Sequence, residues 1–598
     1  MGLTLRISLC AALCTALALV AFTANANAAS PNADEQFEAI GARYIDESPA
    51  FSPVGATALG DHRFDSQLNQ ISEEARAASV SFDKEILAAL ENIDVNELSR
   101  ANQVDYGMLK HDLERSIWST ETLQEWAWNP LNYSSLAGGA VYGLMKREFA
   151  PLDERLSYVA DRLEQFPRMY EQVRATLVPA RVPPIHAETA VKQNRGVLSI
   201  LENMVKPNMG VLSESERARL EEAIETAKEA VETHQVWLEE ELAPNAQGEF
   251  RIGQELYDTK LAYSLHEPLD REDIRELALS EMERVRNQMY DLSCDVYLEK
   301  FPYTEFPENP SEEYKQSIIR ACLEMAYEDM PPEDKLVETA RECLRDTTAF
   351  VRERDLVTIP PDPIEIIVMP EFERGVSIAY CDSPGPLDVG QKTFYAVAPL
   401  PEDWTDDQIL SFLREYNIRS LNDLTVHEAM PGHFLQLAHA NRYPGRLRAM
   451  LSSGVFIEGW AVYTEVMMSV DQGYYDDCPL QKLITLKWYL RGIGNALIDQ
   501  SIHVDGMTRD EAMQLMIEGT FQEEREAAAK WVRAQLTSAQ LSTYFVGYVE
   551  VAKIREVYEA KQGDDFDIKA FHDRLLSYGS PAVHYVRALM FDEEIPRY

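Results

Sequence analysis

The spacing of apolar side chains predicts a mainly α-helical chain. Long stretches place apolar residues every three or four positions with charged residues between them, as in helices with one buried face. Two expected helices begin with a capping box, Ser213 with Glu216 and Thr508 with Glu511. The pattern predicts helices over residues 32–49, 68–92, 98–125, 153–178, 213–243, 269–299 and 311–327.

One region departs from this helical spacing. Residues 364–369, 376–381 and 393–398 are rich in β-branched and aromatic side chains and are separated by turn-forming residues, which predicts three short strands. A small sheet over about 364–398 could pack only against helices. Alternatively, one of its edge strands could pair with an extended peptide substrate.

The first residues have the features of an export signal. Arg6 supplies a positive charge, residues 7–22 are apolar, and small residues follow, so we expect a signal peptide over residues 1–28. The apolar stretch is short for a membrane span. Leu13 directly before Cys14 does not fit a lipoprotein signal. No later stretch has the pattern of a membrane span, so we expect a periplasmic or secreted protein.

Composition limits the classes of function. The chain has 598 residues, of which 45% are hydrophobic, so residues 29–598 can form a single large helical domain. The formal net charge of −44 argues against a nucleic-acid partner, which would require a basic face. Cys322 and Cys343 are one possible disulfide pair in an oxidising compartment. The sequence has no Cys-x-x-Cys motif, so a thiolate zinc site is not expected.

Candidate metal chemistry is concentrated at residues 427–433, His-Glu-Ala-Met-Pro-Gly-His. Catalytic zinc sites use neutral imidazoles and carboxylates, and the zincin motif His-Glu-x-x-His adds a glutamate as general base. Here the second histidine is six residues after the first, which on an unbroken helix would separate them by about 120°. Pro431 and Gly432 can interrupt a helix and return His433 towards His427. The alternative is a helix that ends at Met430 with both histidines on the surface.

Three acidic residues could complete the site. Glu458 lies in the apolar segment Phe-Ile-Glu-Gly-Trp, where an uncompensated carboxylate would be costly and coordination to a cation would remove that cost. Glu465 is seven residues further along and would share its helix face. Asp423, four residues before His427, could accept the free ring N–H of that histidine. It could equally be a first-turn charge that interacts with the helix dipole.

These motifs resemble a bacterial family of unknown function, DUF885, whose signature is His-Glu-Ala-x-Pro-Gly-His followed by Glu-Gly-Trp-Ala-x-Tyr-x-Glu. The second motif is present at residues 458–465, and residues 541–547 and 571–579 also look like that family. The family is placed among zincin-like peptidases with a glutamate as third ligand. The resemblance implies a large helical zincin-like fold with a small sheet before the active-site helix. Phe434 departs from the family, which commonly has another histidine there.

The resemblance also implies roles for individual residues between 423 and 465. His427, His433 and Glu458 would bind zinc, and Glu465 would support the site, for example by holding a ligand histidine. The roles of Glu458 and Glu465 could also be exchanged. Glu428 would take the proton of the attacking water and pass it to the leaving amine.

A peptidase also needs a donor for the developing oxyanion. Tyr544 is the preferred candidate and His503 the second, although either could be a buried structural residue. Arg491 or Arg587 could clamp a substrate carboxylate through two hydrogen bonds, or could form structural ion pairs.

Together these features predict a zinc-dependent metallopeptidase that hydrolyses short unstructured peptides. A carboxypeptidase-like preference would follow if an arginine clamp exists. Two alternatives remain open: a zinc hydrolase of a non-peptide amide or ester, and a pseudo-enzyme that binds peptides. The presence of Glu428 argues against the second alternative, because a pure binder needs no general base beside the metal.

Overall fold

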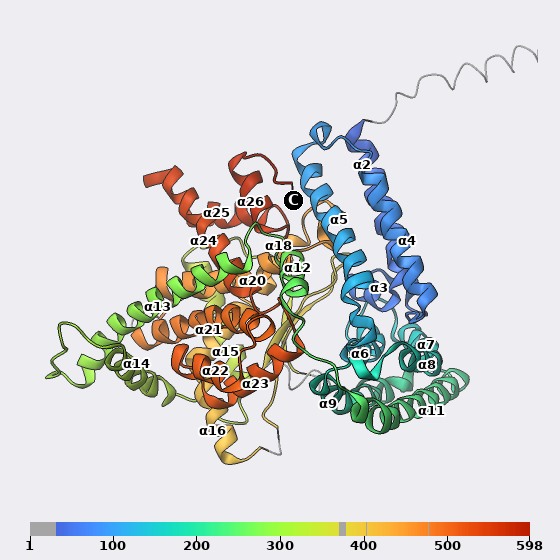
Figure 1. Cartoon of the computed structure of the whole chain (residues 1–598), viewed down its shortest axis with the longest axis horizontal. Coiled ribbons are helices and arrows are strands. Elements are labelled where there is room, and N and C mark those ends of the chain that lie inside the picture. The colour runs from blue at the N-terminus through green and yellow to red at the C-terminus, as the bar shows by residue number, and fades with distance from the viewer. Residues whose placement is uncertain (1–31, 370–377, 402–403, 476–477, 598) are drawn as a thin grey trace, which may run out of the picture.

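The computed structural model describes residues 32–369, 378–401, 404–475 and 478–597. The expected signal peptide, residues 1–28, lies outside the described residues. The predicted mainly α-helical class is confirmed, since helices account for most of the described chain and the strands form one small sheet. Figure 1 shows that the N-terminal helices occupy one side of the molecule and the later helices the other.

The first side is built entirely of helices. The long helices α2, α4 and α5 pack together, and α6 to α11 form the adjoining layer (Figure 1). Their bounds are α2 Ala33–Glu47, α3 Pro53–Leu59, α4 Glu73–Leu90, α5 Arg100–Trp118, α6 Leu131–Met145, α7 Leu152–Leu163, α8 Phe166–Thr176, α9 Pro184–Gln193, α10 Gly196–Ile200 and α11 Glu214–Trp237.

One helix prediction on this side was wrong. The expected single helix over residues 153–178 is two helices, α7 and α8, joined by a turn at residues 164–165. Pro167 explains the break, because proline has no backbone N–H and fits in the first turn of a helix but not in its interior.

The second side carries the sheet and the helices that follow it. Helices α17, α18, α20, α21 and α24 pack against one another, and α17 also contacts β2. The bounds are α12 Gln254–Leu265, α13 Arg271–Lys300, α14 Glu312–Tyr327, α15 Leu336–Glu353, α16 Asp406–Glu415, α17 Ile418–Glu428, α18 His433–Ala440, α19 Arg446–Met450, α20 Gly454–Val466, α21 Pro479–His503, α22 Arg509–Gln514, α23 Glu524–Leu536, α24 Thr543–Gln562, α25 Ile568–Leu576 and α26 Val583–Phe591.

The three predicted strands are present as β1 Ile364–Val368, β2 Ala379–Asp382 and β3 Thr393–Val397. Their order is β1-β3-β2, with β1 parallel and β2 antiparallel to β3. The first two residues of the expected second strand, 376–377, lie outside the described residues. Tyr395 of β3 is fully buried and its hydroxyl lies 3.3 Å from Thr425 Oγ1, which ties the sheet to α17.

A buried ion pair joins the two sides of the molecule. Arg448, on α19, donates to Asp105 of α5 over 2.6 Å, and its other nitrogens donate to the carbonyl oxygens of Ala101 and Tyr578. The Arg448 side chain is almost completely buried, so removing Asp105 would leave an uncompensated charge in the interior.

The possible Cys322–Cys343 disulfide is not formed, because all five described cysteines are free. Cys322 instead donates from its thiol to the carbonyl oxygen of Ser293. Burial raises the pKa of Cys322 to about 11 and that of Cys343 to about 12, so both are thiols at neutral pH.

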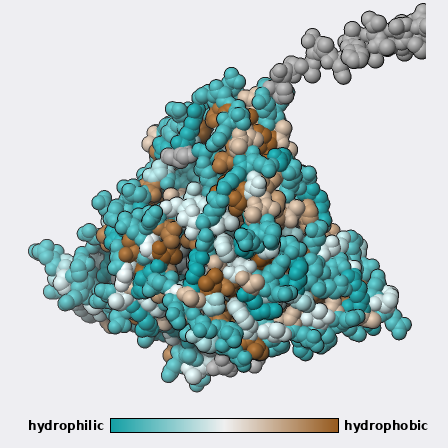
Figure 2. All heavy atoms as spheres, turned by 45° about the vertical axis from the view of Figure 1, so that its right-hand side comes forward, coloured by the Kyte–Doolittle hydropathy of each residue, from teal (hydrophilic) through white to brown (hydrophobic). Residues whose placement is uncertain are grey.

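The surface agrees with the acidic composition. Figure 2 shows a mainly hydrophilic face on which apolar residues gather only in small, separate areas. Among the described helices, none combines the length and the apolarity needed to cross a membrane.

A glycine pair brings α20 and α24 into close contact. A Cβ built on Gly547 of α24 would lie 2.2 Å from the carbonyl oxygen of Val455 and 2.6 Å from the Cα of Gly459, both on α20. No side chain fits between these backbones. This contact fixes the position of α24, and with it Tyr544, relative to the helix that carries Glu458.

We expect Gly547→Ala to lower the melting temperature, because overpacking of this kind costs about 1–3 kcal/mol. Gly492→Ala on α21 is the matched control, since a Cβ there meets no atom within 4 Å. Alanine favours helices over glycine by about 1 kcal/mol, so the control should melt at the same temperature or higher. Equal melting temperatures for the two variants would show that the helices can separate without cost.

Candidate metal centre

The helix that carries His427 is interrupted before His433, as the Pro-Gly pair predicted. Helix α17 ends at Glu428 and α18 begins at His433. The Gly432 N–H donates back to the carbonyl oxygen of Val426 over 2.9 Å. A Cβ on Gly432 would lie 1.9 Å from the carbonyl oxygen of His427, so only glycine allows the chain to turn back this closely.

Trp460 fixes this interruption against α20. Its indole Nε1 donates to the carbonyl oxygen of Pro431 over 2.9 Å, and the side chain is fully buried. Trp460 lies two residues after Glu458 on the same helix. The hydrogen bond therefore connects the turn between the two histidines with the helix that supplies the carboxylate.

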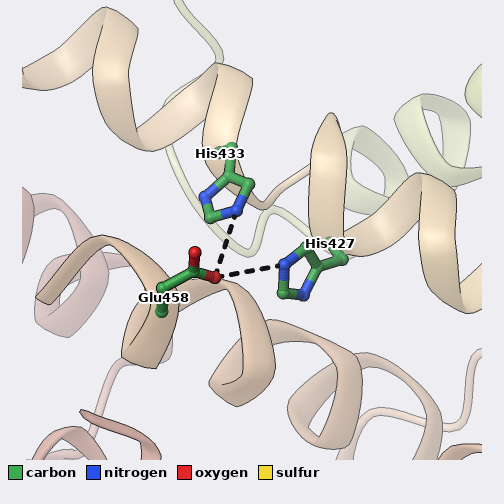
Figure 3. Close-up of side chains that lie close together, drawn as sticks. All are labelled: His427, His433 and Glu458. Carbon is green, nitrogen blue, oxygen red and sulfur yellow. Dashed lines mark ion pairs between the residues drawn. The ribbon is translucent and has the colours of Figure 1, made fainter. Parts of the chain in front are cut away.

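His427, His433 and Glu458 point towards one another from three helices (Figure 3). The Nε2 atoms of both histidines lie 3.5 Å from the same atom, Glu458 Oε2, and ligand atoms of all three residues lie within 4.8 Å of one another. In a tetrahedral zinc site with bonds of about 2.0–2.1 Å, neighbouring ligand atoms are separated by about 3.3 Å. The spacing therefore fits a metal ion between the three side chains.

The electrostatics of the cluster also fit a cation. Glu458 Oε2 is buried and makes no hydrogen bond in the described structure. Burial would raise the pKa of Glu458, but the two imidazoles outweigh it and hold this pKa well below its usual range. One carboxylate and two imidazole nitrogens are ligand types that zinc prefers. Because metal ligands must be deprotonated, a bound metal ion would displace the protons from these groups.

The partner of His427 Nδ1 is Glu465, not Asp423. Glu465 Oε1 lies 2.5 Å from His427 Nδ1, which leaves Nε2 directed at Glu458. The predicted contact from Asp423 was wrong. Asp423 accepts hydrogen bonds from Thr485 and Gln481 of α21, so its carboxylate is turned to that helix and not to His427. Burial, reinforced by the charge of Glu465, raises the pKa of Asp423 well above its usual value.

Glu428 adjoins the cluster with a free carboxylate. It is largely buried, and no described residue forms a hydrogen bond or ion pair with its carboxylate. Its charge reaches the sheet, since it contributes to raising the pKa of Cys381 on β2, although burial is the largest cause there. This carboxylate therefore lies beside the candidate metal ligands without a partner among the described residues.

The two predicted oxyanion donors lie in different places. The Tyr544 ring centroid is 6.5 Å from that of His427, so this residue borders the cluster. Its hydroxyl oxygen accepts a hydrogen bond from Arg533 over 3.2 Å, which leaves the phenol proton free to be donated. His503 is buried at the end of α21, where Nε2 lies 2.9 and 2.8 Å from the carbonyl oxygens of Ala534 and Thr537. His503 is therefore a buried structural residue and not an oxyanion donor.

The two predicted arginine clamps also differ. Arg587 lies on α26 in a partly exposed ion pair with Glu593, which matches the structural ion pair considered for it and not the clamp. Arg491 lies closer. Burial raises the pKa of Glu465, and the hydrogen bond to His427 together with the positive charge of Arg491 acts against that rise.

Two further cations near Tyr544 were missed by the sequence reasoning. Lys530 and Arg533 are three residues apart on α23 and therefore share a helix face. In the sequence, these two residues are marked only by the spacing of charged residues on α23. Such spacing is common on exposed helices, so it does not indicate a functional site. Their position relative to His427, His433 and Glu458 depends on how α23 packs against α21, which the sequence does not reveal.

The comparisons with known proteins identify the family. A model of the family described as "Bacterial protein of unknown function (DUF885)" matches residues 53–590. The chain therefore belongs to this bacterial family. No curated protein matches the chain.

Two solved structures are similar over nearly their whole length. The first, a predicted lipoprotein of unknown function from Shewanella oneidensis, has 33% identity and a TM-score of 0.77, with 93% of this chain and 99% of that chain covered. The second, a predicted lipoprotein from Colwellia psychrerythraea, has 17% identity and a TM-score of 0.75, with 93% and 98% covered. The second similarity shows a shared fold.

We predict that Glu465→Gln weakens zinc binding by about 10–100-fold, the usual cost of losing the carboxylate behind a ligand histidine. Asp423→Asn is the control, because Asp423 makes its hydrogen bonds to α21 and not to His427. Zinc dissociation constants measured with a competing chelator would compare the two variants. A larger loss in Asp423→Asn would contradict the assignment of Glu465.

Proposed function

We propose that the protein is a zinc-dependent metallopeptidase that acts on short peptides. The proposal rests mainly on the convergence of His427, His433 and Glu458, with two ring nitrogens each 3.5 Å from one carboxylate oxygen. The uncompensated carboxylate of Glu428 beside them adds the general base that a binding protein would not need. The described part of the chain offers no second group of histidine, cysteine and acidic side chains with metal-ligand spacing.

The zinc ligands would be His427, His433 and Glu458, with the ring of His427 oriented by Glu465. When bound, zinc would supply Lewis acidity, which lowers the pKa of a coordinated water and polarises a carbonyl group. Three protein ligands leave a coordination position open, as in catalytic zinc sites.

The remaining chemistry belongs to the side chains around the ligands. Glu428 accepts a proton from the attacking water and delivers it to the leaving amine. Tyr544 donates a hydrogen bond from its phenol O–H to the developing oxyanion, while Arg533 holds the hydroxyl oxygen in place. The buried surroundings strengthen these interactions, because charges in a low-dielectric site are weakly screened.

The sheet favours a peptide over another acyl substrate. β2 is an edge strand of the described sheet and packs against α17, which carries Glu428. An extended peptide can add to such an edge through backbone hydrogen bonds, with its scissile bond near the metal.

We also propose that the protein acts outside the cytoplasm. The support is the export-type pattern of the first residues together with the 33% identity to a predicted lipoprotein from Shewanella oneidensis.

The metal assignment predicts about one zinc ion per chain, with most of it lost in His433→Ala and in Glu458→Ala. His439→Ala is the matched control, since its Nε2 lies 2.8 Å from the carbonyl oxygen of Thr358 on the exposed side of α18. Metal content by plasma mass spectrometry would measure the effect. Full zinc in both ligand variants would overturn the assignment.

The general-base assignment predicts that Glu428→Gln keeps zinc and fold but loses about 100-fold or more in turnover, the usual scale for general acid–base catalysis. Glutamine preserves the size of the side chain and removes its basicity. Turnover should be measured on a mixture of short peptides by mass spectrometry, with zinc content as the control. Activity within a few-fold of the wild type would show that another group takes the proton.

A further inference from the structure

A group of three cations adjoins the metal cluster in a chain with a net charge of −44. Tyr544 forms the connection: its ring borders His427, and its hydroxyl accepts a hydrogen bond from Arg533. Lys530 lies one turn before Arg533 on α23, and Arg491 approaches from α21. We call Arg491, Lys530 and Arg533 the cationic subsite.

The cationic subsite has too few negative partners. Glu526 is the only described carboxylate that forms an ion pair with any of its members. It accepts a hydrogen bond from Arg491, lies 3.8 Å from Lys530, and also accepts one from Tyr416. The neighbouring Glu415 is not a further ion-pair partner of the cationic subsite, because its carboxylate pairs with the buried Lys487 at 2.8 Å.

Two members have donors without acceptors. The Lys530 side chain is only 3% exposed, and its ammonium group makes no hydrogen bond to a described residue. Arg491 Nη1 is also buried without a partner. Burial, together with repulsion from Arg491, holds the pKa of Lys530 well below its usual value. The lowered pKa means that burial disfavours the charged form of Lys530, and an anion bound beside it would favour that form again.

We propose that the cationic subsite binds a carboxylate of the peptide substrate, most directly the C-terminal one. This inference rests on the proposed peptidase function and specifies its substrate class. The cationic subsite is separated from His427 by the side chain of Tyr544. An extended peptide advances about 3.3–3.6 Å per residue, so a carboxylate bound there would lie a few residues beyond the scissile bond. Arg533 and Arg491 supply planar guanidinium donors, and a carboxylate bound beside Lys530 favours the protonated, positively charged form of that amine.

The same chemistry could recognise an acidic side chain near the end of the peptide. Three acetylated tetrapeptides separate these sources: tetra-alanine as the free acid, tetra-alanine as the amide, and an amide that carries one aspartate. Titration calorimetry with zinc-loaded Glu428→Gln protein measures binding without turnover. The result therefore does not depend on whether the chain is a peptidase.

We expect the free acid to bind at least about tenfold more tightly than the amide, the scale of hydrogen bonds to a charged group. Lys530→Met and Arg533→Met should reduce this difference to within about threefold, and Lys530→Arg should preserve it. Methionine keeps the length of the side chain and removes a costly buried charge, so the fold should persist. Arg587→Met is the matched arginine control and should leave the difference unchanged.

Tight binding of the aspartate-containing amide as well would extend the subsite to acidic side chains. Equal binding of all three peptides, or no binding of any, would overturn the proposal. So would an acid preference that survives in Lys530→Met and Arg533→Met, since the carboxylate would then bind the metal itself. A preference that the two variants abolish, combined with no hydrolysis by the wild type, would keep the subsite and reject the peptidase.

Discussion

The metal cluster depends on one backbone constraint, the interruption of the helix at Pro431-Gly432. Without it, the six-residue spacing would direct His427 and His433 to different faces of a helix. With it, both rings face Glu458, each with Nε2 3.5 Å from the carboxylate. The hydrogen bond from Trp460 to the carbonyl of Pro431 holds this geometry against α20. The cluster is thus built by packing three helix segments onto one another.

A second constraint is electrostatic. The site buries Asp423, Glu428 and Glu465 together with the Oε2 atom of Glu458, and His427 and His433 lie against this group of carboxylates. Burying so many acidic groups is costly unless protons, cations or hydrogen bonds compensate them. A metal ion between the two histidines and Glu458, as proposed, would provide that compensation. The cationic subsite next to Tyr544 has the opposite imbalance, so the proposed centre would hold a metal and an anion at separate positions.

Much of this arrangement could be predicted from local sequence. Helical periodicity, capping boxes and the three β-rich segments determine most elements, because these signals act over a few residues. The motif at residues 427–433 predicted the helix break, since proline and glycine change the backbone wherever they occur. Glu458 followed from the cost of a carboxylate in an apolar segment, together with the resemblance to the family.

The errors concern contacts between distant segments. Helix spacing made Asp423 one candidate partner of His427, but α20 brings Glu465 to Nδ1 of that histidine. His503 and Arg587 were plausible by residue type, but their positions depend on the packing of α21 and α26. Spacing along the chain reports which residues share a helix face and says nothing about which other helix that face meets.

The central claim is that two histidines and one glutamate bind a single zinc ion, and X-ray absorption at the zinc edge tests it most directly. For the zinc-loaded protein, we predict a first shell of nitrogen and oxygen at about 2.0–2.1 Å with imidazole scattering from two rings. That imidazole signal should fall in His433→Ala. Sulfur scattering at about 2.3 Å, or a failure to retain zinc in stoichiometric amount, would contradict the account.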